Sequence, residues 1–214
     1  MNQHPFEQKL YSGQCTQAEI RRWLINRYFF EETMMRKDCV ILANSNDHEF
    51  RKVWVKRVID SQAPGGGLDQ WRTMCVSAGI QPLEMLEVTP GAKKACDNYL
   101  NQCISTHWKL VVAGSLSQIR AALNHQKKCD TWYDFYPGID FSYFQVRKEQ
   151  AKEDSQRCLE FIEQWELHPD HRTTAARLKK QLMDAILDDC EIAPRDAASL
   201  PEPTPRFNFE NHSC

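Results

Sequence analysis

The chain has 214 residues, of which 42% are hydrophobic, and this length is enough for one domain with a substantial core. Its formal net charge is −2 and no run of Lys and Arg could follow a phosphate backbone, so the composition argues against a general nucleic-acid-binding protein. Residues 1–20 lack the apolar segment of a secretory signal, and the longest apolar runs are too short to cross a membrane. We therefore expect a cytoplasmic protein that binds neither nucleic acid nor membranes.

The nine cysteines are spread along the chain without a CxxC pair. An odd number at irregular spacing is typical of neither a disulfide framework nor a zinc site. We expect reduced thiols, most of them packed as small apolar groups.

Helical spacing of apolar residues runs through the first half of the chain. Thr16 and Glu19 form a capping box at the start of a long helix, and Asp47 can cap the next one. The Thr89-Pro90 pair places a cap and a proline at the first helical position. The predicted helices in this half are 16–44, 47–62, 68–78, 81–86 and 89–104.

The second half continues the same pattern. We predict helices over 106–128, 140–167 and 169–188, with an aromatic connector at 132–138. Prolines and scattered polar residues after Ala193 indicate a disordered tail over 193–214. No alternation typical of strands is present. The fold class is therefore predicted to be all-α, a compact bundle of seven or eight helices in one domain over 1–192.

Three arginines occupy positions on or beside the apolar stripes of predicted helices. These are Arg27, Arg57 and Arg147, and Glu31 and Asp38 fall on the same helix face as Arg27. A buried guanidinium needs an anionic partner or a wet cavity. The recurrence on three helices favours a pocket for an anionic guest. The alternative is that each side chain reaches solvent from the edge of its stripe.

A second group of polar residues suggests proton-transfer chemistry. Gln118 and His125 share a helix face, and Tyr143, Arg147 and Gln150 share another. If the two faces meet, one pocket contains an imidazole, a phenol and a guanidinium, which suit proton transfer beside a bound anion or reduced oxygen. The sequence has no nucleotide-binding glycine motif, no hydrolase motif and no Glu-x-x-His pair for a metal.

Several segments resemble the family of pyrroloquinoline quinone (PQQ) biosynthesis protein C, the PQQ synthases. The resemblance covers most of the chain from His4 to Asp188 and is more specific in the first half. The matching segments are 20–30, 37–38, 42–44, 57–60, 66–71, 76–80, 99–101, 125–126, 132, 136–137 and 143–144.

This resemblance implies a haem-oxygenase-like fold and a cofactor-free oxidase. Such an enzyme closes a ring and oxidises a polycarboxylated quinone precursor with O2, releasing H2O2 and PQQ. The substrate is itself redox-active, so the protein supplies position, charge and proton transfer, without a metal. The resemblance also implies a homodimer.

The resemblance assigns roles to ten residues. His125, Tyr143 and Arg147 would form the site that handles O2, and Tyr99 would line the pocket for the rings. The remaining predicted substrate-binding residues are Arg27, Lys37, Arg57, Gln118, Lys128 and Lys180.

The chain also departs from the family pattern. Ser61 stands where the family has an active-site histidine, Gln118 where it has a glutamate, and Lys128 where it has an arginine. The Tyr-His pair that the family carries ahead of His4-Pro5 has no match here. Losing a general acid or base typically costs about 10²–10⁴-fold in rate. A homologue that binds a polyanionic small molecule without turnover is therefore an alternative. A di-metal oxygenase is a further alternative, although Arg147 would place a cation where such an enzyme holds its metal ions.

Overall fold

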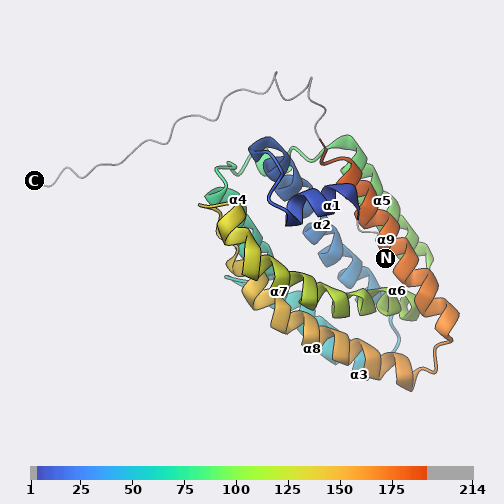
Figure 1. The fold of residues 1–214 in the computed structure, drawn as a ribbon. Helices are drawn as coiled ribbons and strands as arrows, with labels where there is room; N and C mark the ends of the chain where they lie inside the picture. Colours follow the sequence, from blue (N-terminus) through green and yellow to red (C-terminus); the bar gives the residue numbers. More distant parts are fainter. Residues whose placement is uncertain (1–3, 192–214) are drawn as a thin grey trace, which may run out of the picture.

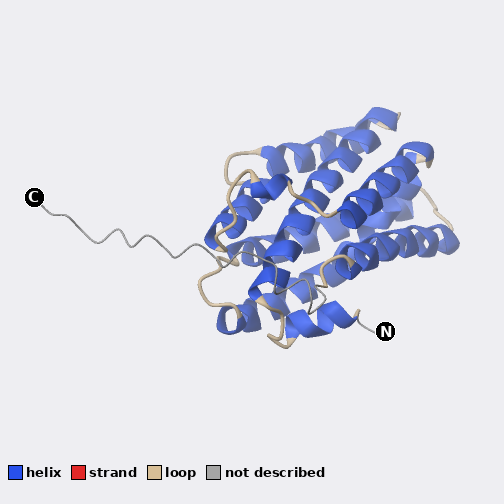
Figure 2. Cartoon of the chain, turned by 90° about the horizontal axis from the view of Figure 1, so that it is seen from above, coloured by secondary structure: helices blue, strands red, loops and turns tan. Residues whose placement is uncertain are grey.

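The described part of the chain is a bundle of helices joined by short loops (Figures 1 and 2). The computed structural model describes residues 4–191, apart from the side chains of residues 117–120, 169, 171 and 172. No strand occurs within this range, so the predicted all-α fold class is confirmed. The predicted tail over 193–214 lies outside the described residues.

The α-helices are α1 (Pro5–Tyr11), α2 (Gln17–Asn44), α3 (His48–Gln62), α4 (Gly67–Ser77), α5 (Pro90–Ser105), α6 (Trp108–Gly114), α7 (Gln118–Phe135), α8 (Ser142–Gln164) and α9 (Pro169–Asp188). Two 3₁₀ segments are η1 (Glu84–Leu86) and η2 (Ser115–Ser117).

Helix α2 runs through the middle of the bundle and contacts α3, α4, α5, α6 and α9 (Figure 1). Its start is fixed by the predicted capping box. The Thr16 hydroxyl accepts a hydrogen bond from the Glu19 amide at 3.2 Å, and the Glu19 carboxylate accepts one from the Thr16 amide at 2.8 Å. These bonds satisfy two backbone donors that an uncapped helix leaves without partners.

Aromatic side chains dominate two cores that α2 separates. One core surrounds Trp23, Trp71 and Trp132 and joins α2 to α1, α4, α7 and α8. The other surrounds Phe50 and Trp108 and joins α2 to α3, α5, α6 and α9. The buried Trp71 indole donates to the Leu24 carbonyl at 3.1 Å, so its polar atom is satisfied inside the first core.

The structure corrects the predicted helices over 81–86 and 106–128. In the first range only the 3₁₀ segment η1 (Glu84–Leu86) is helical. Residues 106–128 do not form one helix, because α6 ends at Gly114 and the backbone tightens into η2. The buried Ser115 hydroxyl at this break accepts a hydrogen bond from Lys37 of α2 at 3.1 Å. After the break, α7 continues to Phe135, so most of the predicted aromatic connector is helical.

Helix α1 is a further difference from the predicted helices. The sequence pattern did not predict it, although Pro5 at the first helical position and the buried pair Phe6 and Leu10 are its signals.

The end of α9 is attached to the start of α5, and the two helices lie side by side (Figure 1). The Asp189 carboxylate accepts hydrogen bonds from the Ala92 amide, at 2.9 Å, and from the Thr89 hydroxyl. A carboxylate is stabilised at a helix N-terminus by the free amides and the helix dipole. This contact fixes the position of α9 against the middle of the chain.

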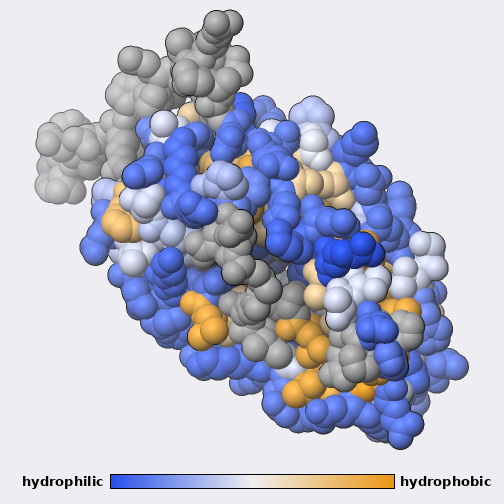
Figure 3. Space-filling view, turned by 45° about the vertical axis from the view of Figure 1, so that its right-hand side comes forward, coloured by the Kyte–Doolittle hydropathy of each residue, from blue (hydrophilic) through white to orange (hydrophobic). Residues whose placement is uncertain are grey.

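The face of the molecule in Figure 3 is mostly hydrophilic, with separate small apolar patches. No described helix is both long enough and apolar enough to cross a membrane. The eight cysteines among the described residues are free thiols, and five of them are buried, as expected from their spacing.

Candidate active site

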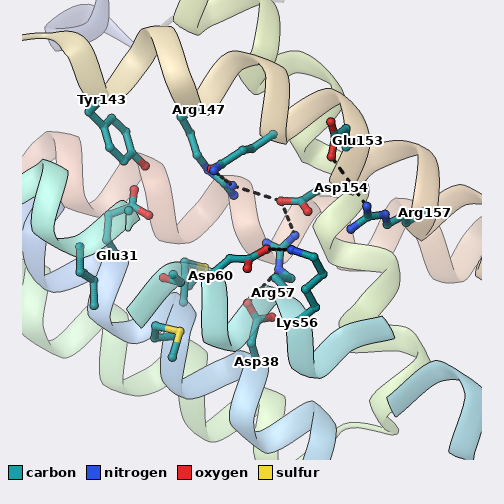
Figure 4. A pocket seen from close by; sticks show the side chains of 16 residues that line it. Glu31, Asp38, Lys56, Arg57, Asp60, Tyr143, Arg147, Glu153, Asp154 and Arg157 are labelled. Carbon is teal, nitrogen blue, oxygen red and sulfur yellow. Dashed lines mark hydrogen bonds and ion pairs between the residues drawn. The ribbon is translucent and has the colours of Figure 1, made fainter. Parts of the chain in front are cut away.

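A pocket opens between α2, α3, α4 and α8 (Figure 4). Its volume is about 110 Å³, smaller than the roughly 300–1,000 Å³ of typical ligand pockets, and charged side chains reach into it. Five carboxylates line it: Glu31, Asp38, Asp60, Glu153 and Asp154. Four cations line it: Lys56, Arg57, Arg147 and Arg157.

Arg57 lies at the centre of this charged network. Its guanidinium contacts Asp38 at 3.0 Å through Nε and Asp154 at 2.7 Å through Nη1. Burial lowers the pKa of Arg57, but the two carboxylates outweigh it and raise the pKa above its ordinary value. The guanidinium is therefore charged and joins α3 to α2 and α8.

Asp38 is enclosed by cations. Lys37 lies 2.8 Å from it and Arg57 lies on its other side. Burial raises the pKa of Asp38, but Lys37 and Arg57 outweigh burial and lower it to about 2. Lys37 is 1% exposed, so the structure buries this predicted substrate-binding residue behind the pocket wall instead of placing it in the lining.

Arg27 and Arg147 also have carboxylate partners from the protein itself. Arg27 is 9% exposed, stacks on Phe30 at 4.0 Å and contacts Glu31 at 2.8 Å. Arg147 contacts Asp154 at 3.2 Å. None of the three arginines reaches freely into solvent. Each pairs with a carboxylate of the protein, Glu31, Asp38 or Asp154, and the anionic guest that the sequence favoured stays a prediction.

Tyr143 and Arg147 lie one helical turn apart on α8 and both line the pocket. Figure 4 shows the Tyr143 hydroxyl and the Glu31 carboxylate directed toward the same part of the pocket. Burial and the charge of Glu31 raise the pKa of Tyr143 above its ordinary value, against Arg147 and Arg27, so the phenol is protonated at neutral pH.

His125 lies behind Tyr143 rather than in the lining of the pocket. The two rings are 6.3 Å apart, so the two helix faces meet at this pair, but the imidazole does not line the pocket with the phenol and the guanidinium. Burial, with Lys128, Arg147 and Arg27, lowers the pKa of His125 to about 2, which keeps the imidazole neutral. Its buried Nδ1 has no hydrogen-bond partner among the described residues.

Lys128 is one turn further along α7. Its ammonium lies 4.4 Å from the Phe144 ring centre, 5.0 Å from Trp132 and 5.6 Å from Trp23. Burial and Arg27 lower the pKa of Lys128 to about 7. Within the described part of the chain, no carboxylate forms an ion pair with this lysine.

The placement of Lys180 is a correction. Its side chain is 59% exposed on α9 and pairs with Asp184 of the same helix. The preceding residue, Lys179, is the inward lysine. Burial, Lys37 and Arg57 lower the pKa of Lys179 to about 7, against Glu31 and Asp38, and its ammonium lies 6.0 Å from the Phe30 ring centre.

Two further predicted residues lie elsewhere. Tyr99 is 7% exposed and lines a separate groove between α5 and α9, so it does not line the charged pocket. The side chain of Gln118 lies outside the described part of the structure. Ser61, which stands where the related family has a histidine, does line the pocket.

Helix periodicity could have identified the residues that the site prediction omitted. Asp154 follows Arg147 by seven positions, which places both on one face of α8. Lys179 precedes the buried Leu182 and Ile186 by three and seven positions, so it lies on the apolar face of α9. Glu31 was recognised on the stripe of α2 but was not included among the site residues.

No group of three or more His, Cys, Asp or Glu side chains in the described residues is arranged to hold a metal ion. The charged groups of the pocket pair with one another instead, carboxylate to guanidinium.

The sequence model of the TENA/THI-4/PQQC family matches residues 1–179. The chain belongs to this family. Its resemblance to the PQQ synthases, first seen in the segments around Arg27 and Arg57, is therefore confirmed.

Within the TENA/THI-4/PQQC family, similar proteins include two curated PQQ synthases. That of Ectopseudomonas mendocina (strain ymp) is 31% identical over 202 residues, which cover 89% of this chain and 81% of that protein. That of Pseudomonas putida (strain W619) is 32% identical over 188 residues, which cover 84% and 72%.

A solved structure is similar in fold. It is a domain of unknown function with a haem oxygenase-like fold from Shewanella denitrificans OS217, with a TM-score of 0.69 and 10% identity. The match covers 87% of this chain and 83% of that one. The haem-oxygenase-like fold predicted for this TENA/THI-4/PQQC family member is thereby confirmed.

Proposed function

We propose that this chain is an oxidase of the PQQ-synthase type, which uses O2 to oxidise a carboxylated quinone precursor without a bound cofactor. The observation that carries the proposal is the convergence of three side chains. Tyr143 and Arg147 line one pocket, and the His125 ring lies 6.3 Å from the Tyr143 ring. The similarity to curated PQQ synthases over most of the chain supports the same reaction class.

In the proposed reaction the protein mainly positions the substrate and transfers protons. A two-electron oxidation transfers two electrons and two protons from the substrate to O2, which leaves as H2O2. The quinone precursor supplies the electrons because it is itself redox-active. The protein must bind the anionic substrate, stabilise the negative charge that develops on oxygen, and move the protons.

Each of the three residues suits one of these tasks. Arg147 provides a fixed positive charge beside reduced oxygen. Tyr143, kept protonated by burial and Glu31, can donate a hydrogen bond. His125 is kept neutral mainly by burial, so its imidazole can accept a hydrogen bond beside Tyr143.

Mixing the purified protein with the ring-open precursor of PQQ in air tests the proposal. The absorbance spectrum reports conversion, and an oxygen electrode reports O2 uptake. Formation of PQQ with H2O2 supports the oxidase. Absence of both, in protein that binds the precursor, contradicts it.

A protein that binds a small anionic molecule without turnover is the second candidate. Ser61 lines the pocket at the position of the family histidine, so one acid–base group of the related enzymes is replaced by a hydroxyl here. A spectral shift of the precursor on binding, without O2 uptake, would favour this candidate.

The homodimer and the cytoplasmic location that we expect remain predictions, and light scattering would test the homodimer.

A further inference from the structure

A row of tryptophan and tyrosine rings leads from the pocket through the first core. Tyr143 lines the pocket (Figure 4), and its ring centre lies 4.8 Å from that of Trp71. Trp71 lies 5.7 Å from Trp23, and Trp23 lies 5.3 Å from Trp132. Trp132 in turn lies 6.1 Å from Tyr136, which follows α7 directly. We call these five residues the ring chain.

The outer end of the ring chain contacts a thiol. The Tyr136 hydroxyl donates to the Leu10 carbonyl at 2.8 Å and also lies within hydrogen-bond reach of the Cys15 thiol. Cys15 is partly exposed, and burial raises its pKa to about 11, so the thiol is protonated at neutral pH. The three indoles between the two tyrosines are buried, so the middle of the ring chain is separated from solvent.

The ring chain joins the side-chain types that lose a single electron most readily, which are indole, phenol and thiol. Rings at these separations are in van der Waals contact, which allows an electron to pass between them. The second core provides a comparison. There the ring of Phe50, which is much harder to oxidise, lies between Trp54 and Trp108.

Two cations lie against the indoles of the ring chain. The Arg27 guanidinium is 5.7 Å from the Trp71 ring centre, and the Lys128 ammonium is 5.0 Å from that of Trp132. An indole that loses an electron becomes a cation, and like charges at this distance repel. An oxidised indole is therefore unfavourable here and takes an electron from the next ring. Oxidation then moves to the outer end, where a phenol and a thiol can release a proton.

We propose that the ring chain carries single electrons from Cys15 to the pocket, where they reduce oxygen radicals that escape the two-electron reaction. The proposal rests on the proposed function only for the source of these radicals. In the pocket, a hydroperoxyl radical gains one electron through Tyr143 and one proton from solvent and becomes H2O2. At the outer end, Cys15 loses one electron and its proton and becomes a thiyl radical. A small thiol in solution restores it by giving up a hydrogen atom and becomes a thiyl radical itself.

Pulsed ultraviolet light tests the ring chain without substrate, because the light removes single electrons from tryptophan. A nitrone spin trap captures the resulting radicals, and mass spectrometry of the digested protein locates the adducts. In the wild-type protein we expect adducts on Cys15 in preference to the exposed thiol of Cys39. Tyr136→Phe keeps the ring and removes only the hydroxyl, so it should fold normally and lower trapping at Cys15 several-fold.

Tryptophan variants test the order of the rings. Trp132→Phe separates all the other indoles from the outer end and should lower trapping at Cys15 more than Trp23→Phe, which leaves Trp132 in place. Trp108→Phe in the second core is the matched control and should leave trapping at Cys15 unchanged, because Trp108 is equally buried but outside the ring chain. Equal trapping at Cys15 in the wild type, Tyr136→Phe and Trp132→Phe would overturn the inference, as would equal losses in Trp132→Phe and Trp108→Phe.

O2 uptake separates this inference from the oxidase. A protein that passes light-driven oxidation to Cys15 but takes up no O2 with the precursor contradicts only the oxidase. In a protein that turns the precursor over, Trp23→Phe should leave the initial rate of O2 uptake unchanged and shorten the time for which activity lasts. An equal lifetime of the two proteins would contradict the protective role of the ring chain and leave the oxidase standing.

Discussion

The guanidinium of Arg57 lies 2.7 Å from the carboxylate of Asp154, and this contact joins α3 to α8 across the pocket. The same guanidinium contacts Asp38 of α2, so a single side chain links three helices. The charges that define the candidate site are therefore also part of the packing of the bundle.

Removal of Arg57 should destabilise the fold. Arg57→Ala leaves the buried Asp38 with Lys37 as its remaining ion-pair partner, and breaking such a pair typically costs about 3 kcal/mol or more. Urea unfolding would measure the loss. The neighbouring Lys56, with a 62% exposed side chain, provides the control, and Lys56→Ala should change stability by less than about 0.5 kcal/mol. Equal effects of the two substitutions would contradict the structural role of Arg57.

Removal of Arg147 should affect turnover more than stability. Its side chain is 22% exposed, and Asp154 keeps Arg57 as a partner when Arg147 is absent. Arg147→Ala is expected to abolish O2 uptake with the precursor and to lower the melting temperature by only a few degrees. Unchanged activity in this variant would remove Arg147 from the proposed site.

The lowered pKa of Lys128 predicts a pH dependence of stability. In the unfolded chain the lysine has its ordinary pKa of 10.5, and burial and Arg27 lower this to about 7 in the fold. Between these pH values the unfolded state holds a proton that the folded state has released. This lysine therefore destabilises the fold most below pH 7, and its cost declines by about 1.4 kcal/mol per pH unit as pH rises toward 10.5.

The substitution Lys128→Met should accordingly stabilise the protein most near pH 6 and least near pH 10. Urea unfolding at several pH values would measure the difference from wild type. Lys127, on the exposed side of the same helix, is the control, and Lys127→Met should show no such trend. A stabilisation by Lys128→Met that is constant across pH would contradict the assignment.

Lys179 and Lys180 provide a paired test of the site. Lys179 is partly buried with its ammonium 6.0 Å from the Phe30 ring centre, and the side chain of Lys180 is 59% exposed. Lys179→Met should weaken binding of an anionic substrate more than Lys180→Met does, because a partly buried charge is less screened by solvent than an exposed one. Lys180→Met should leave affinity within about twofold. Titration of both variants with the same ligand would show which lysine lies near the site. A larger effect of Lys180→Met would contradict the placement of Lys179 as the inward lysine.

The sequence correctly predicted the features that depend on residues close together in the chain. The capping box at Thr16 and the proline at position 90 identified helix starts, and the spacing of Arg27, Glu31 and Asp38 placed their charges on one face of α2. The break between α6 and α7 was missed because apolar spacing continues through Gly114, and only the tertiary contact of Ser115 with Lys37 distinguishes this position.

The ion pairs of the pocket depend on contacts between helices that are distant in the sequence. Asp154 and Arg57 are 97 positions apart, and no local pattern shows that they meet. The sequence therefore indicated a pocket rich in arginine but not the carboxylates that neutralise it. The prediction chose Lys180 instead of the neighbouring Lys179. Adjacent positions on a helix point about 100° apart, so an error of one residue moves the side chain from the inward face to the exposed one.

The contact between Arg27 of α2 and Met183 of α9 has a consequence for how the protein is made. The two residues are 156 positions apart in the chain. At synthesis rates of about 5–20 residues per second, on the order of ten seconds pass between the emergence of the two helices from the ribosome. During that interval the arginine face of α2 lacks its cover from α9, and the nascent chain presents a partly open bundle to chaperones and proteases. The arginine face of α2 is covered only when α9 has been synthesised and has folded onto it.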